Sequence, residues 1–442
     1  MRRIAFLRVA AGSLLTPALW PGLSGQRPRY GGTLVVETRS RAAGLEPNPA
    51  SVDLRRLAAA VFEGLVGRNE TGAVVSQLAL SWSYDAVKRQ WQFALRPNVR
   101  AHDGTVVSPG AIAASLSGLL SPRVVSTGSD SFTIQCSQAE PGLIEELAEP
   151  RFRLARTGPF KVTEWLPGLR GFLAAHEAHW QGRPYLNAIE VRMSRTLRDQ
   201  LFDFEGGRAD VVELSLADSR RQAGQRGRET WSSAPLDLVA LVFVRSKPGV
   251  QEERVRRGIA LAIDRGPIAQ VLLQRAGEAT GNFLPQRVSG YGFLFGAERD
   301  LERSAQMLKP APPALVLGYD AAEPSLRLIA ERIALNVGDA GVTLKPSSTD
   351  DPDLILTRVP VTATEPGLAL TEYGRGLQMP LPAFGRSREE VLQAERKSLV
   401  GGWVAPLFHV PSTYGVRTRV RNWVKPGAVW WRLEEAWLEP DR

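Results

Sequence analysis

The chain has 442 residues, of which 43% are hydrophobic and 23% are charged. This composition excludes an intrinsically disordered chain and a membrane-embedded bundle, and the length is enough for two or three globular domains. The formal net charge is +9, but the arginines are spread along the whole chain, so the charge predicts no nucleic-acid partner.

The first 25 residues differ in character from the rest of the chain. Met1-Arg2-Arg3 precedes a mainly apolar run over 4–20, and small residues and a proline follow at 21–25. A basic start, an apolar middle and a small-residue exit are typical of an export signal, with a membrane anchor as the alternative. We therefore expect residues 1–25 to direct the protein to the periplasm or another extracytoplasmic space.

Three strands and two helices are predicted before residue 137. Runs rich in β-branched residues or alternating in polarity predict strands at 33–38, 91–96 and 132–136. An apolar run predicts a short helix at 57–65, and Ser108-Pro109 predicts the capped start of a helix over 111–120. Cys136 ends the third strand on its apolar side, so we expect core packing for it; a lone cysteine excludes an intramolecular disulfide.

The second half of the chain predicts a sheet covered by helices. A strand at 236–243 precedes a helix at 252–263. A strand at 314–319, a helix whose apolar residues recur over 326–337, and a strand at 342–344 form a βαβ unit with parallel strands. The spacing of Leu433, Ala436 and Trp437 predicts a final helix that packs on the first part of the protein.

Motifs for catalysis or metal binding are weak. His176 and His179 are three residues apart, whereas the helical zinc motif needs two histidines four apart with a glutamate beside the first. The chain has no nucleophile elbow, phosphate-binding loop or dinucleotide fingerprint. We therefore predict no metal ion, no cofactor and no catalytic residue.

Several short motifs follow one another in an order that resembles a single protein family. In chain order they are Tyr30-Gly31-Gly32-Thr33-Leu34, Leu45-Glu46-Pro47, Val61-Phe62-Glu63-Gly64-Leu65-Val66, Trp91-Gln92-Phe93-Ala94-Leu95-Arg96, Val99-Arg100-Ala101-His102-Asp103-Gly104, Thr157-Gly158-Pro159-Phe160, Trp180-Gln181-Gly182-Arg183-Pro184-Tyr185-Leu186 and Val255-Arg256-Arg257-Gly258-Ile259-Ala260-Leu261-Ala262-Ile263-Asp264-Arg265. This order is similar to that of the family 5 extracellular solute-binding proteins, the oligopeptide, dipeptide and nickel binders that serve ABC importers.

The resemblance implies an α/β, two-lobed, periplasmic-binding-protein-like (type II) fold with an extra small domain inserted in the first lobe. It places the first lobe at 30–48, 156–235 and 412–442, the inserted domain at 49–155 and the second lobe at 236–411. It also implies a non-enzymatic, monomeric protein that traps a peptide-like or other small solute between its lobes. The implied partner is an ABC permease in the inner membrane.

The stretches that align with the ligand contacts of peptide binders depart from the family pattern. Arg41 lies nearest to an acidic position before the Leu-Asp-Pro element, Val359 replaces an aromatic residue, and Thr362 replaces the aspartate that pairs with a peptide's ammonium group. We therefore expect Arg41 and Arg358 to favour an anionic or neutral ligand, or else to face solvent. The predicted ligand-binding residues are Arg41, Ala43, Arg358, Val359, Thr362 and His409.

Two other functions remain open at this stage. The first is a degenerate binding protein that acts as a ligand sensor or structural partner without transport. The second is an enzyme built on the same scaffold, which carboxylates or His409 inside a cleft would favour.

Overall fold

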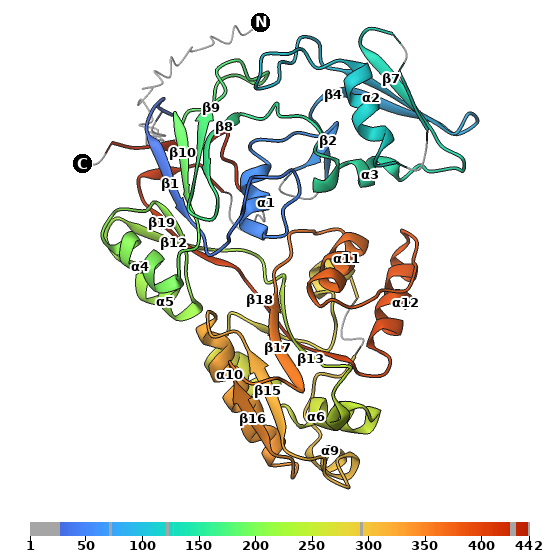
Figure 1. Cartoon of the computed structure of the whole chain (residues 1–442), viewed down its shortest axis with the longest axis vertical. Helices are drawn as coiled ribbons and strands as arrows, with labels where there is room; N and C mark the ends of the chain where they lie inside the picture. The colour runs from blue at the N-terminus through green and yellow to red at the C-terminus, as the bar shows by residue number, and fades with distance from the viewer. Residues whose placement is uncertain are drawn as a thin grey trace, which may run out of the picture.

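A computed structural model describes residues 27–69, 73–120, 123–126, 128–291, 295–424 and 430–440. The predicted export signal or anchor at 1–25 lies outside the described residues. The described residues form five sheets, and Figure 1 shows that the three largest lie in separate parts of the protein, with the two largest joined near the centre. The helices of the described residues all lack the length or the apolar character that a membrane crossing needs.

The first lobe is built on a seven-stranded mixed sheet. Its strands, in spatial order, are β12 (Arg228–Ser232), β19 (Thr413–Arg417), β11 (Val211–Glu213), β1 (Thr33–Glu37), β10 (Ala188–Arg192), β9 (Arg170–Ala175) and β8 (Phe160–Leu166). β1 runs parallel to both of its neighbours, and its Leu34 and Val36 are buried in the core of the lobe. The strand predicted at 33–38 is therefore confirmed at the centre of this sheet.

The second lobe is built on a six-stranded sheet. Its strands, in spatial order, are β14 (Glu278–Ala279), β18 (Val404–Val410), β13 (Asp237–Phe243), β17 (Leu354–Val359), β15 (Leu315–Tyr319) and β16 (Leu344–Ser347). Successive residues of β13 alternate between two cores, since Leu238 packs on one face of the sheet and Val239 on the other. Burial on both faces explains why this strand reads as a continuous apolar run.

Helices cover both large sheets, and one of them confirms the predicted βαβ unit. They are α1 (Val52–Ala58), α4 (Leu197–Glu205), α5 (Leu216–Gln222), α6 (Glu253–Ala262), α7 (Arg265–Pro267), α8 (Gln286–Ser289), α9 (Leu301–Met307), α10 (Pro324–Gly338), α11 (Pro366–Gly376) and α12 (Arg388–Leu399). α10 connects β15 to β16, and these two strands pair in parallel.

The third sheet has its own core. It comprises β4 (Ala79–Asp85), β5 (Gln90–Leu95), β7 (Ser131–Gln135) and β6 (Arg123–Ser126), with α2 (Pro109–Ser117), α3 (Leu143–Leu147) and the hairpin β2 (Val66–Arg68) to β3 (Val74–Ser76) nearby. Ser108 caps α2 as predicted, and Cys136 is buried in this core. The boundaries of an inserted domain stay a prediction.

The chain crosses between the two large sheets twice at one place. Segment 233–236 leads from β12 to β13, and segment 411–412 leads from β18 to β19. The two segments are hydrogen-bonded: Ser233 N donates to Ser412 O at 2.9 Å, and Ser412 N donates to Ser233 Oγ at 3.0 Å. We call this pair of segments the hinge.

Two predicted helices are wrong in ways that matter for the site. The helix expected at 57–65 begins earlier, at Val52, because the Ser51 side chain caps it by accepting from Leu54 N. The helix expected near Leu433 is absent: Leu433 and Trp437 are buried as predicted, but Trp437 lies in the short strand β21 (Trp437–Leu438), which pairs with β20 (Val420–Arg421).

Glu395 on α12 is a buried carboxyl group with too few partners. It accepts a hydrogen bond from Leu284 N at 2.9 Å, while its Oε2 atom has no partner among the described residues. Burial raises the pKa of Glu395 to about 7. The folded protein therefore favours the protonated form.

This burial predicts a pH-dependent stability. Because the folded-state pKa lies above the ordinary value of 4.5, the contribution of Glu395 is complete only below pH 4.5, and about 2 to 3 kcal/mol of it is lost as the pH rises through 7. Glu395→Gln should gain stability relative to wild type between pH 5 and pH 8.5 in urea unfolding. Glu389→Gln, an exposed position on the same helix, is the control and should show no such gain.

Candidate functional site

Two cavities lie between the first and second lobes. The hinge cavity has a volume of about 380 Å³ and includes the hinge residues Pro411 and Ser412 in its wall. The outer cavity has a volume of about 750 Å³ and is bounded by α1, α11 and the loop at 180–185. One helix contributes to both, since Asp53 of α1 lines the hinge cavity and Arg55 lines the outer cavity. This interface between lobes is the candidate site.

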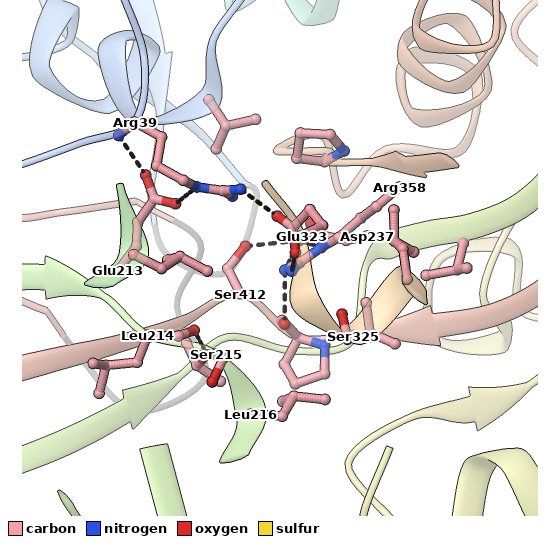
Figure 2. A pocket seen from close by; sticks show the side chains of 18 of the residues that line it. Arg39, Glu213, Leu214, Ser215, Leu216, Asp237, Glu323, Ser325, Arg358 and Ser412 are labelled. Atoms are coloured by element: carbon pink, nitrogen blue, oxygen red, sulfur yellow. Dashed lines mark hydrogen bonds and ion pairs between the residues drawn. The ribbon is translucent and has the colours of Figure 1, made fainter. Parts of the chain in front are cut away.

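Arg39 connects the two lobes across the hinge cavity. Its Nε atom lies 2.6 Å from Glu213 Oε2 in the first lobe, and its Nη1 atom lies 2.5 Å from Glu323 Oε1 in the second (Figure 2). Burial lowers the pKa of Arg39, but the two carboxylates outweigh that effect and hold it above its usual value. The charge of Arg39 is therefore already balanced by the protein itself.

Arg358 is held in the same way at the end of β17. Its Nη2 atom lies 2.6 Å from Asp237 Oδ2 and donates to Pro411 O at 3.0 Å, and its Nη1 atom lies 3.8 Å from Glu323 Oε2. Ser412 Oγ also donates to Asp237, at 2.9 Å. Figure 2 shows this group of side chains converging on the hinge.

A coupled pair of carboxyl groups, Asp53 and Glu213, forms another wall of the hinge cavity. The Thr38 hydroxyl lies 3.1 Å from Asp53 Oδ2 and 3.2 Å from Glu213 Oε1. Burial and the nearby charge of Asp53 raise the pKa of Glu213. Burial opposes the ionisation of Asp53, but hydrogen bonds and the charge of Arg56 outweigh it and lower the pKa of Asp53. Proton binding at the two carboxyl groups is therefore linked, because ionisation of Asp53 disfavours ionisation of Glu213.

The outer cavity is bounded by facing sides of two helices. Residues of α11 at helical spacing, Leu368, Thr371, Glu372 and Arg375, line it from the second lobe. Arg55 of α1 faces them from the first lobe, and its Nη1 atom lies 2.6 Å from Glu372 Oε1. Thr362 N also donates to Glu372, at 2.8 Å. The carboxylate nearest to Thr362 is therefore neutralised by an arginine of the opposite lobe.

The six residues predicted to bind ligand are not brought together. Arg358 lines the hinge cavity and Thr362 the outer cavity. Arg41 and Ala43 are exposed after β1, and neither is among the residues that line these two cavities.

Val359 and His409 lie in the core of the second lobe instead. Strand alternation turns Val359 away from the face that carries Arg358. His409 is 2% exposed, bonds Phe283 O at 2.8 Å, and has its pKa lowered to about 4 by burial. For these four residues the structure offers no contact with either cavity, and their role in binding stays a prediction.

A third histidine, His102, lies near the pair His176 and His179 that the sequence analysis singled out. His102 lies beside His176, with ring centroids 5.0 Å apart, and both rings bond the Gly158 carbonyl. His179 Nε2 lies 3.3 Å from Glu63 Oε1. Within the described parts of the chain, no three His, Cys, Asp or Glu side chains are arranged to hold a metal ion.

Sequence reasoning missed the residues that cross between the lobes, namely Arg39, Arg55, Glu323 and Glu372. Their pairing joins positions up to 317 residues apart, as for Arg55 and Glu372. Nothing in the local sequence marks such a partner. A signal that could have found Arg55 is Ser51, which our sequence analysis did not use: its side chain caps α1, and a helix that begins at Val52 includes Arg55, which lines the outer cavity.

The ion pairs between lobes predict a closed conformation that weakens when one of them is removed. Arg39→Gln should shift the equilibrium toward open lobes by about 1 kcal/mol, or about five-fold, since the pair is partly exposed. Small-angle X-ray scattering should show this as a larger radius of gyration with unchanged circular dichroism. Arg170→Gln breaks a 2.6 Å ion pair with Glu164 within the first lobe and should leave the radius unchanged. An equal change in both variants would contradict the prediction.

Comparison with known proteins places this fold among binding proteins. The chain is 22% identical over 302 residues to the nickel-binding periplasmic protein of Escherichia coli, an alignment that covers 60% of this chain and 58% of that protein. The chain thus spans less than two thirds of that relative's length.

Solved structures agree along nearly the whole chain. NikA from Staphylococcus aureus in complex with Ni(L-His)2 has a TM-score of 0.78 at 14% identity, covering 92% of this chain and 100% of its own. A dipeptide-binding protein from Pseudoalteromonas sp. SM9913 in complex with Met-Leu has a TM-score of 0.79 at 13% identity, with the same coverage. These likenesses confirm the predicted two-lobed α/β fold.

The family model "Bacterial extracellular solute-binding proteins, family 5 Middle" matches residues 137–385, which is more than half of the chain. The predicted family is therefore confirmed: the chain belongs to the family 5 bacterial extracellular solute-binding proteins.

Proposed function

We propose that this protein is the extracytoplasmic solute-binding component of an ABC importer, and that it delivers a small solute to a membrane permease. The observation that carries the proposal is a pair of lobes joined by one hinge, with cavities of about 380 and 750 Å³ enclosed between them. Membership of family 5 supports it.

The proposed mechanism is reversible closure without chemistry. A solute that contacts both lobes binds the closed form more tightly than the open form, so it shifts the population toward closure. The permease then recognises the closed form. We propose that the protein acts as a monomer outside the cytoplasm, and that no bond is made or broken in its site.

The outer cavity is the proposed solute site. Its walls come from both lobes, it is the larger of the two cavities, and it contains the half-buried Trp180 and Trp430, which can pack against an apolar part of a solute. A free ammonium group is disfavoured there, because Glu372 is already paired with Arg55. We therefore propose an anionic or neutral solute rather than a free-amine peptide.

The ion pairs between lobes also support a second candidate, a protein that closes without solute and acts as a sensor or structural partner. Arg39–Glu323 and Arg55–Glu372 already join the two lobes. The two candidates differ in one testable respect: only a solute-binding component needs a solute to occupy the outer cavity.

The test is to identify the solute that accompanies the protein. The full chain, exported and purified without refolding, should show a bound small molecule in native mass spectrometry that is released on denaturation. Adding the isolated molecule back should raise the melting temperature and reduce the radius of gyration.

A cavity-filling variant provides the control for this experiment. Thr371→Trp places a large side chain on the face of α11 that lines the outer cavity and should abolish solute binding. Leu335→Trp, on the exposed side of α10, should bind as wild type does. A protein that purifies empty, and whose lobes close equally with and without candidate solutes, would contradict solute binding and favour the second candidate.

A further inference from the structure

The arginines around the outer cavity are not all paired. Five of those that line it have a carboxylate within ion-pair distance: Arg55 (Glu372), Arg68 (Glu145), Arg151 (Glu146 and Glu149), Arg183 (Glu177) and Arg432 (Glu435). Arg153 and Arg375 also line the cavity, and neither has a carboxylate at that distance among the described residues. They come from opposite lobes.

Arg153 is the more confined of the two. Its Nη1 atom donates to Arg55 O at 3.1 Å, and its guanidinium carbon lies 5.1 Å from the ring centroid of Trp430. Burial, and then the positive charge of Arg55, lower the pKa of Arg153 to about 9. Arg153 is half-buried, and its Nη1 atom also lies 3.5 Å from Pro47 O, so the acceptors around it are neutral carbonyl groups. A partly desolvated cation without a counter-charge is unfavourable, so this position suits an anion supplied from outside the chain.

The acidic residues of the cavity do not supply that counter-charge. Glu63 accepts from Trp180 Nε1 at 3.0 Å and from Thr157 at 2.6 Å, and Glu149 accepts from Arg151. Burial raises the pKa of Glu434. The remaining two, Glu372 and Glu435, are paired with arginines other than Arg153 and Arg375.

We propose that the outer cavity binds an anionic small solute, and that Arg153 holds its carboxylate or phosphate group while Arg375 reaches the same solute from the second lobe. This inference rests on the proposed function and names the class of solute. The planar guanidinium fork matches two oxygens of either group, which makes Arg153 the specificity-determining residue. A solute held by one cation from each lobe contacts both only when they are closed.

The test compares oxyanions with chloride on the full chain. Thermal unfolding is measured in sodium succinate, sodium phosphate and sodium chloride at equal ionic strength, for wild type, Arg153→Gln, Arg153→Lys and Arg151→Gln. Arg151 lines the same cavity two residues away but already has carboxylate partners, so Arg151→Gln is the matched control. Comparing variants cancels the general stabilisation that phosphate gives to any protein.

We expect succinate or phosphate to raise the wild-type melting temperature beyond chloride, and the better of the two identifies the group recognised. Arg153→Gln should lose at least half of this excess, Arg151→Gln should keep it, and Arg153→Lys should keep part of it. In chloride alone, Arg153→Gln should melt no more than a few degrees from wild type, which shows that the variant folds.

Two results of this unfolding experiment would each overturn the inference: an excess that is the same in Arg153→Gln and wild type, or no excess over chloride for either oxyanion. A neutral or cationic solute released from the purified protein would also overturn it, while leaving the proposed function intact. If no solute of any charge closes the lobes, the proposed function itself fails.

Discussion

One buried carboxylate, that of Asp237, ties the second lobe to the hinge. It stands at the first position of β13, is 2% exposed, and receives Arg358 from the neighbouring strand and Ser412 from the returning segment of the chain. Because these three residues lie in three separate segments, the carboxylate fixes where the chain may pass between lobes. The hinge cavity, the position of Glu323 and the orientation of Arg39 all depend on that crossing.

The fold could be predicted from the sequence to a large extent. Alternating or apolar runs located β1, β5, β7, β13 and β15, and the apolar repeat of α10 gave a βαβ unit with the correct parallel pairing. The failures have local causes. Ser51 starts α1 earlier than the apolar run suggests, and beyond α1 the segment near Glu63 is extended and bridges Ala155. Near Leu433, burial is satisfied without a helix.

The site could be predicted much less well. Arg358 and Thr362 do line cavities, but Arg358 is paired with Asp237, 121 residues away, and the Glu372 carboxylate beside Thr362 is paired with Arg55, 317 residues away. Charge pairing of this kind depends on which segments the hinge brings face to face, and a single sequence does not contain that information. The expectation of an anion-compatible cavity rested on Arg41 and Arg358. The arginines that line the outer cavity without a carboxylate partner among the described residues are instead Arg153 and Arg375.

The position of α1 as a shared wall has a consequence for how the two cavities communicate. Asp53 and Arg55 are two residues apart on one short, fully buried helix, and they line different cavities. Because α1 contributes side chains to both cavities, a shift of this helix when a solute binds in the outer cavity also moves the wall of the hinge cavity. Occupancy of the larger compartment would thus change the proton affinity of the Asp53–Glu213 pair, and by thermodynamic reciprocity proton uptake there would change the affinity for the guest.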